Sequence, residues 1–388
     1  LGMRRMEEMF RKYGKDTVLA CIRQIYHETE QKCRNVVARI TDGVYEAESF
    51  LDEDGVTKGE RVRIHAKVTV NSGHMTIDLS GCSGERKAAI NSRTYAGARV
   101  AYKALTSPLD AVNEGSFTAC DVIIPEGNIM MARYPAPMAG WSHILPMVVD
   151  TIVRALAPAM KDNIPAAHHG LLSGGVVFFG KQPKTGRGFV VQSIEGGGWG
   201  GRPTEDGESG TVTVCQGDVR NASIESIEMK CPVIIQNRGL RQDSGGPGKF
   251  RGGLGLNVRA KNLVEGRWNL DSPRRNQCLP WGLWGGMEGD TEQKLLQLEG
   301  QEYKKVEQNR YPVPANAVAW VSTGSGGGWG DPLDRDPARV QWDVIEELVS
   351  EKSARENYGV ILGKDHSIDI AATEAQRAKL RAAPRAKV

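Results

Sequence analysis

The sequence predicts an α+β protein with mixed sheets, a β-rich C-terminal half and flanking helices. Amphipathic helical patterns lie near both ends of the chain, and alternating apolar and polar residues predict a β-hairpin over 61–79. Short apolar runs separated by Gly, Pro and Asn occupy residues 165–325, as is typical of strands joined by turns. We expect four regions: an N-terminal helical segment (1–40), an α+β region (41–165), a β-rich glycine-loop region (166–335), and a C-terminal helix and tail (336–388).

The first half of the chain carries the clearest local patterns. Residues 3–39 predict one helix or a helix pair broken near Gly14, with Asp16 as a candidate cap of the second helix. The expected elements that follow are a hairpin turning at 71–74, a helix at about 86–106, a short strand at 122–124, and a helix at about 143–157 that Pro158 ends.

The second half predicts short strands and then a helix. The expected strands are 176–179, 189–192, 211–214, 233–236 and 317–321, and the pattern places none within 262–315. A helix from Pro337 to about residue 357 is expected, capped by Asp334 or Asp336. Residues 360–362 could add an edge strand, and 364–388 predict a frayed helix or a disordered tail.

The composition is that of an ordinary globular protein. The 388 residues are 40% hydrophobic and 25% charged, and the net charge is only +3 with Lys and Arg dispersed. This balance favours neither nucleic-acid nor membrane-surface binding. Without a long apolar run or a signal-peptide pattern, we expect a cytoplasmic protein. Seven cysteines without a C-x-x-C pair predict reduced thiols rather than disulfides or a zinc site.

Three glycine-rich runs dominate the second half. They span 196–201, 244–255 and 324–330, and the first and third share the core Gly-Gly-Gly-Trp-Gly. Glycine at this density is kept where the backbone needs positive φ or a close approach. We therefore expect the three runs to form one surface and the wall of a shared pocket. The P-loop pattern is absent, although Lys249 beside open backbone amides could hold a phosphate or carboxylate.

The third run continues into a segment with a family resemblance. Residues 326–362 resemble the C-terminal signature of the hydantoinase B/oxoprolinase family, which includes subunits of ATP-dependent hydantoinases, 5-oxoprolinases, and acetone and acetophenone carboxylases. The resemblance covers roughly residues 1–362, with further matching segments in the right order at 42–48, 113–115, 122–127 and 243–248. Longer members begin upstream with a portion that carries a His-His-Ala-Asp metal motif, which is absent from this sequence. A chain that begins at Leu1 is consistent with a fragment or a processed chain.

The resemblance implies a subunit of a larger enzyme. A hydantoinase A-like partner would bind ATP and activate a carbonyl or amide oxygen of a small-molecule substrate. This hydantoinase B-like chain would then complete the ring-opening hydrolysis of a cyclic amide such as hydantoin or 5-oxoproline. A divalent metal would bind outside this chain. The family's N-terminal metal-binding portion could be supplied by a separate chain. Two alternatives stay open: a subunit of an acetone/acetophenone-type carboxylase, and a non-catalytic scaffold that completes a partner's active site.

Candidate catalytic residues are Glu195, His168 and His169. Glu195 precedes the first glycine run and, with Arg202 seven residues later, could flank a substrate carbonyl. Adjacent histidines on a strand face opposite sides and cannot grip one metal, so we expect no metal ligand here; they could instead be hydrogen-bonded loop residues. Candidate substrate-binding residues are Gly197, Gly198, Trp199, Arg202, Asp243, Lys249 and Trp329.

A cysteine nucleophile is a weaker hypothesis. No G-x-S-x-G nucleophile elbow occurs, and Cys82 lies in a loop of small residues before the helix expected at about 86. A helix N-terminus would lower the pKa of this thiol and activate it. The other interpretation is a simple tight turn.

Overall fold

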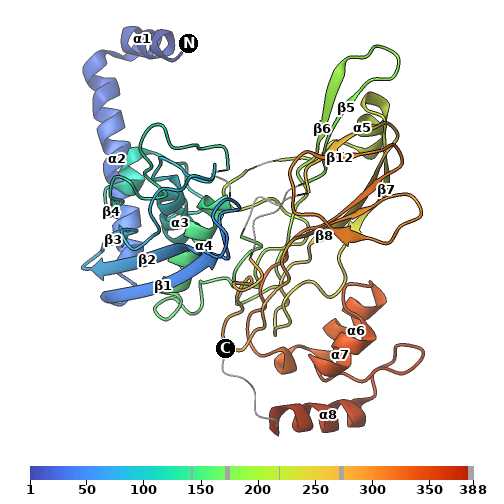
Figure 1. The fold of residues 1–388 in the computed structure, drawn as a ribbon. Coiled ribbons are helices and arrows are strands. Elements are labelled where there is room, and N and C mark those ends of the chain that lie inside the picture. The colour runs from blue at the N-terminus through green and yellow to red at the C-terminus, as the bar shows by residue number, and fades with distance from the viewer. Residues whose placement is uncertain (141–142, 171–174, 218, 271–274, 383–388) are drawn as a thin grey trace.

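The computed structural model describes residues 1–140, 143–170, 175–217, 219–270 and 275–382. Helices flank three mostly antiparallel sheets within these ranges, which confirms the predicted α+β class (Figure 1). Three clusters of buried apolar side chains form separate cores. The first lies mainly within residues 33–167, the second within 176–321 and the third within 340–360.

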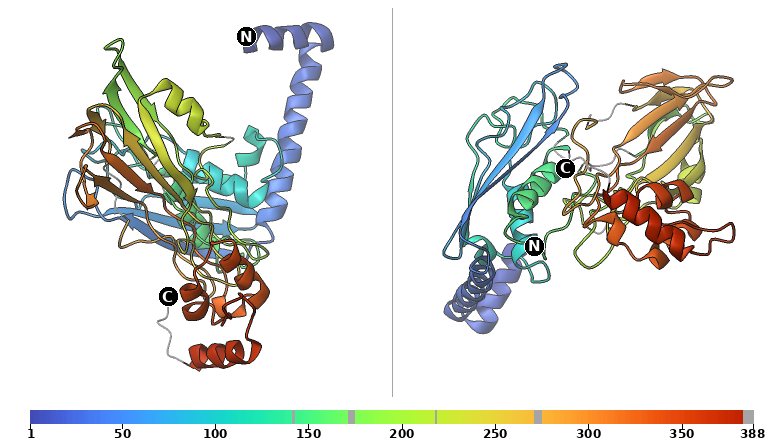
Figure 2. Two further views of the ribbon diagram at one scale, coloured as in Figure 1. Left: turned by 90° about the vertical axis from the view of Figure 1, so that its right-hand side faces the viewer. Right: turned by 90° about the horizontal axis from the view of Figure 1, so that it is seen from below.

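Two helices open the chain, as predicted. Helix α1 (Gly2–Tyr13) and helix α2 (Lys15–Val37) meet at Gly14, whose φ of +82° breaks the helical path. Gly14 is itself the N-cap of α2, and Asp16 in the first turn makes no capping hydrogen bond. Helix α1 buries no residue and lies at an angle to α2, at the N-terminal start of α2 (Figure 2).

The first sheet has the strand order β1-β2-β3-β4. The strands are β1 (Gly43–Leu51), β2 (Val62–Asn71), β3 (His74–Asp78) and β4 (Cys120–Ile123), and only the β3–β4 pair is parallel. The predicted hairpin is confirmed, because Asn71 pairs with His74 and alternate residues of β2 are buried. Helix α4 (Leu145–Leu156) packs on β1 and β2, while α3 (Ala96–Thr106) packs on α4 and the 3-10 helix η1 (Glu114–Phe117) on α2.

The helix predicted over 86–106 starts ten residues late, at Ala96. The preceding loop is fixed by the buried Asn91. Its side-chain amide donates hydrogen bonds to the carbonyls of Arg86, Ala88 and Pro137, and its carbonyl oxygen accepts the Arg86 N–H. These bonds replace the helical ladder, so the small residues around 88 do not continue the helix.

The second core lies between two further sheets. One has the order β11-β10-β13-β8-β7, and the other β12-β9-β5-β6. Their strands, in chain order, are β5 (Val177–Lys181), β6 (Gly188–Gln192), β7 (Val233–Leu240), β8 (Leu256–Asn262), β9 (Gly266–Trp268), β10 (Gln293–Gln297), β11 (Lys304–Lys305), β12 (Tyr311–Val313) and β13 (Val318–Ser322). A short helix, α5 (Ile224–Lys230), precedes β7 and is capped by Ser223.

The strand predicted at 211–214 is wrong. Only Thr211 forms a bridge, with Gly197, because this segment bonds to the first glycine run rather than to a sheet. The region 262–315, where the sequence placed no strand, contains short ones from β9 to β12.

The C-terminal helix is divided in two. Helix α6 (Pro337–Ile345) follows the 3-10 helix η3 (Pro332–Asp334) and is capped by Asp336, which accepts the Ala338 N–H at 2.9 Å. Helix α7 (Glu351–Glu356) starts separately because Ser350 caps it. Residues 360–362 form no strand beyond an isolated Leu362 bridge, and the tail forms a helix, α8 (Ile370–Ala382).

Candidate functional site

The glycine runs converge, as predicted, but they lie in the interior rather than on a surface. We call residues 196–201, 244–255, 281–289 and 324–330 the glycine lattice. Its runs exchange backbone hydrogen bonds across long stretches of chain: Gly198 N–H to Gly324 O (3.1 Å), Gly201 N–H to Gly327 O (2.8 Å), Gly253 N–H to Trp199 O (2.7 Å), Gly326 N–H to Gly253 O (3.0 Å) and Leu283 N–H to Gly328 O (2.9 Å). The fourth run, 281–289, was not anticipated from the sequence.

Close backbone approach explains why these positions are glycine. A Cβ on Gly198 would overlap the carbonyl oxygen of Gly253, and a Cβ on Gly326 would overlap that of Trp199. With no side chains between them, several backbones pack directly against one another, and their polar groups pair in the interior. The lattice therefore fixes the positions of the residues at its edges.

One edge of the lattice holds the two candidate histidines. His168 is buried, its Nδ1 lies 2.6 Å from Asp150 Oδ1 on α4, and its Nε2 lies 3.3 Å from Thr213 Oγ1. The His169 ring is 5.3 Å from the His168 ring, and its backbone N–H donates to Gly198 O at 2.9 Å. An aspartate on one imidazole nitrogen fixes the tautomer and the ring orientation.

The first glycine run packs on these histidines. A Cβ on Gly197 would overlap the His169 ring, and the Trp199 ring stands edge-on to His168 at 6.3 Å. The Trp199 indole N–H donates to the Val212 carbonyl at 2.7 Å, which holds that ring in place. The structure thus brings His168, His169, Gly197, Gly198 and Trp199 together from segments that the sequence singled out separately.

Glu195 lies just before this run and is fully buried. Its Oε1 accepts a hydrogen bond from Arg238 Nη2 at 2.8 Å, and its Oε2 is 3.4 Å from Asn221 Nδ2. Arg238 comes from β7, so this ion pair ties the lattice to the second core. Both oxygens of the candidate carboxylate thus have partners within the chain.

The remaining candidates lie toward the C-terminal helices. Lys249 N–H donates to Gly330 O at 3.1 Å, and the Phe250 ring lies 6.1 Å from the Trp329 ring. Arg202 is paired with Glu205 at 2.7 Å. The contacts described for these residues are with one another and with neighbouring segments rather than with the histidines.

Asp243 joins two parts of the chain. It has a φ of +62°, and its Oδ1 accepts the Ser350 N–H at 2.8 Å, at the start of α7. Asp243 thus helps to fix the start of α7, a contact that the sequence pattern did not reveal.

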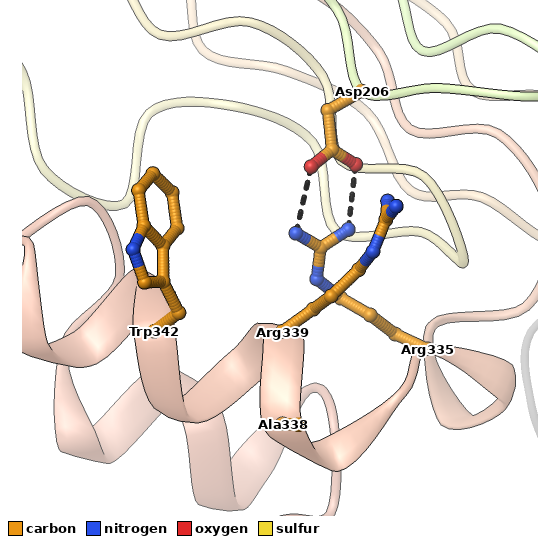
Figure 3. A pocket seen from close by; sticks show the side chains of 5 residues that line it. All are labelled: Asp206, Arg335, Ala338, Arg339 and Trp342. Atoms are coloured by element: carbon orange, nitrogen blue, oxygen red, sulfur yellow. Dashed lines mark hydrogen bonds and ion pairs between the residues drawn. The ribbon is translucent and has the colours of Figure 1, made fainter.

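A pocket of about 360 Å³ lies against helix α6 and was missed in the sequence (Figure 3). Its lining residues are Asp206, Arg335, Ala338, Arg339 and Trp342. Arg335 is buried and bonds both oxygens of Asp206, at 2.6 and 2.8 Å, and it also lies 2.8 Å from Asp343. Burial alone would raise the pKa of Asp206, but the hydrogen bonds and charge of Arg335 outweigh it and lower that pKa. The sequence signals were Asp206, an acidic residue after the first glycine run, and the charged run 334–336, which was interpreted as helix capping.

The cysteine hypothesis is not supported by the structure. Burial raises the pKa of Cys82 to about 11, and α3 starts at Ala96, so no helix N-terminus lies beside this thiol to lower it. The cysteines described are free thiols.

Two features are absent from the described ranges. They contain no group of three or more His, Cys, Asp or Glu side chains that could hold a metal ion. In the same part of the chain, no helix is both long and apolar enough for a membrane crossing.

The chain belongs to the hydantoinase B/oxoprolinase family, whose model matches residues 1–332. It is 29% identical over 397 residues to the B subunit of a putative D-/L-hydantoinase from Pseudomonas sp. (strain NS671), covering 97% of this chain and 65% of that protein. It is also 29% identical to the beta subunit of the caprolactamase of Pseudomonas jessenii, covering 97% of this chain and 67% of the relative. The chain thus spans about two thirds of the length of these relatives.

Other matches include a carboxylase and two solved structures. The acetophenone carboxylase delta subunit of Aromatoleum aromaticum is 25% identical, over 92% of this chain and 58% of the relative. The crystal structure of the ATP-dependent caprolactamase from Pseudomonas jessenii superposes with a TM-score of 0.83 at 27% identity, covering 97% of this chain and 67% of that one. Nucleotide-free acetone carboxylase shares the fold, with a TM-score of 0.85 at 20% identity over 97% of this chain and 57% of that one.

Proposed function

We propose that this chain is the hydantoinase B-like subunit of an ATP-dependent enzyme that opens cyclic amides, working in a complex with a hydantoinase A-like ATP-binding subunit. The observation that supports this proposal is the similarity, over 97% of the chain, to relatives named for hydantoin and caprolactam hydrolysis. Both compounds are cyclic amides. A cytoplasmic complex, with its divalent metal bound outside this chain, completes the proposal.

The proposed reaction divides the work between the subunits. The partner transfers the terminal phosphoryl group of ATP to the amide oxygen and releases ADP. Water then adds to the activated carbon, the C–N bond breaks, and the ring nitrogen takes up a proton. A second water hydrolyses the resulting acyl phosphate to a carboxylic acid and phosphate. Activation by ATP is needed because an amide carbonyl is a poor electrophile.

The residues of this chain have proposed roles in the second stage. His168 acts as a general base: Asp150 holds its Nδ1, and its Nε2, which lies 3.3 Å from the Thr213 hydroxyl, is the nitrogen that accepts a proton. His169 and Glu195 assist as polar groups of the same site, and Gly197, Gly198 and Trp199 line it. Contacts to the rest of the substrate are assigned to Arg202, Asp243, Lys249 and Trp329.

Reconstitution tests the proposed function. The chain is combined with a hydantoinase A-like partner, and ADP and ring-opened acid are measured with hydantoin, 5-oxoproline and caprolactam. We expect ring opening that requires ATP and both chains, and a large loss of rate in a His168→Gln variant. The proposal fails if the partner opens the ring equally well without this chain. Unchanged rates in both His168→Gln and Glu195→Gln would instead identify a non-catalytic scaffold.

A role in a carboxylase is the second candidate, supported by the similarity to the acetophenone carboxylase delta subunit. The same complex is therefore incubated with acetone or acetophenone, ATP and bicarbonate. Formation of a β-keto acid without any opening of cyclic amides would favour this candidate over the first. The two outcomes are distinguished by the product, because only carboxylation forms a new C–C bond.

A further inference from the structure

A second pocket, of about 540 Å³, lies where elements of the first core face elements of the second. On one side are the loop after β1, with Asp54, and the residues just before α4, with His143. On the other side are Asn269 after β9 and Lys294 in β10. We call it the interlobe pocket. It contains none of the residues that the sequence singled out.

The interlobe pocket has a buried ion pair in its wall. Glu292 and Lys294 are 8% and 7% exposed, and Lys294 Nζ lies 3.3 Å from Glu292 Oε1. Removing two charges from water costs several kcal/mol per ion in general, and a well-packed apolar pair would often be as stable. Buried charges that line a cavity are therefore candidates for a role in binding.

Two more polar atoms in this wall lack a partner. Asp54 is 8% exposed, and its Oδ1 accepts the N–H groups of Val56 (2.8 Å) and Thr57 (2.6 Å). Its other oxygen, Oδ2, is buried with no hydrogen-bond partner among the described residues, and the same is true of His143 Nδ1. Burial lowers the pKa of His143 to about 4, so its ring is neutral near neutral pH. A buried polar atom without a partner in the protein is costly, and a bound water or ligand can supply the missing hydrogen bond.

The polar groups define what would fit. Asp54 Oδ2 can only accept from an N–H or O–H, whereas Lys294 can only donate to a carbonyl or similar oxygen. The side-chain oxygen of Asn269 already accepts the Arg310 N–H at 2.9 Å. Its NH₂ group is therefore the part of the side chain that can donate to a ligand, as Lys294 can. A ligand with an N–H next to a C=O matches acceptor and donors together. The volume is ample for a ring of five to seven atoms.

We propose that the interlobe pocket is a recognition site for the cyclic amide before its activation, separate from the histidine site, with the ring N–H donated to Asp54 and the ring carbonyl accepting from Lys294. This inference rests on the proposed function for its substrate class, but on the pocket's own side chains for its location. The amide thus lies between the first and second cores. Asp54 and Lys294 act as specificity residues that recognise opposite ends of the amide group.

Binding to the full chain tests the location without ATP or a partner. The probes are pyrrolidinone and γ-butyrolactone, two five-membered rings that differ only at one ring position, which is N–H in pyrrolidinone and oxygen in the lactone. Their binding is measured by ligand-observed NMR. We expect saturable binding of pyrrolidinone. The affinity for the lactone should be lower by about tenfold or more, because one hydrogen bond to a carboxylate is lost. Asp54→Asn, which keeps the Oδ1 that organises the loop, should weaken pyrrolidinone binding by a similar factor.

A matched pair of variants tests the pocket itself. Ala89 lines the pocket from an exposed position, so Ala89→Trp fills the space without removing a buried group. Lys87→Trp, at an exposed position two residues earlier and outside the lining, is the control. We expect pyrrolidinone binding to be lost only in Ala89→Trp. Absence of saturable binding to the wild type, or equal binding by both variants, would overturn the assignment.

The reconstituted complex separates this inference from the proposed function. Ring opening at the wild-type rate by the Ala89→Trp complex would remove the pocket assignment and leave the proposed function standing. The reverse result is also possible: pyrrolidinone binds the wild type but not Ala89→Trp, and the reconstituted complex opens no cyclic amide. That result would support the pocket assignment and reject the proposed function.

Discussion

Replacing Gly198 by alanine should destabilise the protein far more than a glycine substitution normally does. The added Cβ would overlap the Gly253 carbonyl oxygen and lie 2.7 Å from the Gly326 nitrogen. Those two groups are bonded to each other at 3.0 Å, so neither can move without weakening that bond. The clash also comes from backbone atoms, which cannot swing aside as a flexible side chain would.

The size of the effect follows from two contributions. Overpacking an interior typically costs about 1–3 kcal/mol. Weakening one interior hydrogen bond adds about 1 kcal/mol, giving a loss of about 2–4 kcal/mol in the free energy of unfolding. Gly239→Ala in β7 is the control, because a Cβ there meets nothing within 4 Å. Alanine in an unobstructed strand should be neutral, or stabilise by about 0.5–1 kcal/mol through the lost flexibility of glycine.

The assay is denaturant-induced unfolding followed by tryptophan fluorescence, which reports on the lattice through Trp199, Trp281 and Trp329. Circular dichroism in parallel follows the sheets and helices. We expect the fluorescence midpoint of Gly198→Ala to fall clearly below that of the wild type, while Gly239→Ala does not fall. Equal midpoints for the two variants would refute the argument that close backbone approach requires glycine in the lattice.

Three further outcomes are expected. Asp150→Ala should cost about 1–3 kcal/mol of stability in denaturant unfolding, because it leaves a buried nitrogen of His168 without its partner. The pKa of Asp206 is lowered by Arg335, so its ionised form stabilises the fold above its ordinary pKa of about 3.9, and that contribution is lost as the pH falls below it. Asp206→Asn should therefore unfold more easily at neutral pH and lose less stability on acidification, as shown by midpoints measured across that range. Cys82, with a pKa of about 11, should resist iodoacetamide in the folded protein at about pH 8 and react once unfolded, as read by mass spectrometry.

Local patterns were sufficient where a segment's structure depends on its own residues. The period-2 alternation in 62–70 predicted the hairpin, and the break at Gly14 followed from a residue that tolerates positive φ. They failed where a distant group intervened. Asn91 holds the chain out of a helix by bonding Pro137, and Asp243 fixes the start of α7 from more than a hundred residues away. Such contacts leave no signal in a local window.

The candidate site shows the same division. Glycine density predicted that distant runs would approach closely, since few other reasons keep so many glycines, and the approach was confirmed. Which side chains the lattice would bring together could not be read from spacing. It gathers His168, His169 and Trp199 but leaves Lys249 and Trp329 toward the C-terminal helices.

The sequence by itself determined the α+β class, the family and the need for close-packed glycine backbones, because these depend on composition, periodicity and ordered motifs. Only the tertiary structure decided that Asp150 would hold His168, that Arg335 would bridge Asp206 and Asp343, and that Asp54 and Lys294 would line one pocket. Each of these arrangements joins side chains from different segments of the fold, and the Arg335–Asp206 and Asp54–Lys294 pairs are more than a hundred residues apart in the chain. Their meeting is set by how the cores pack, and no short stretch of sequence encodes that packing.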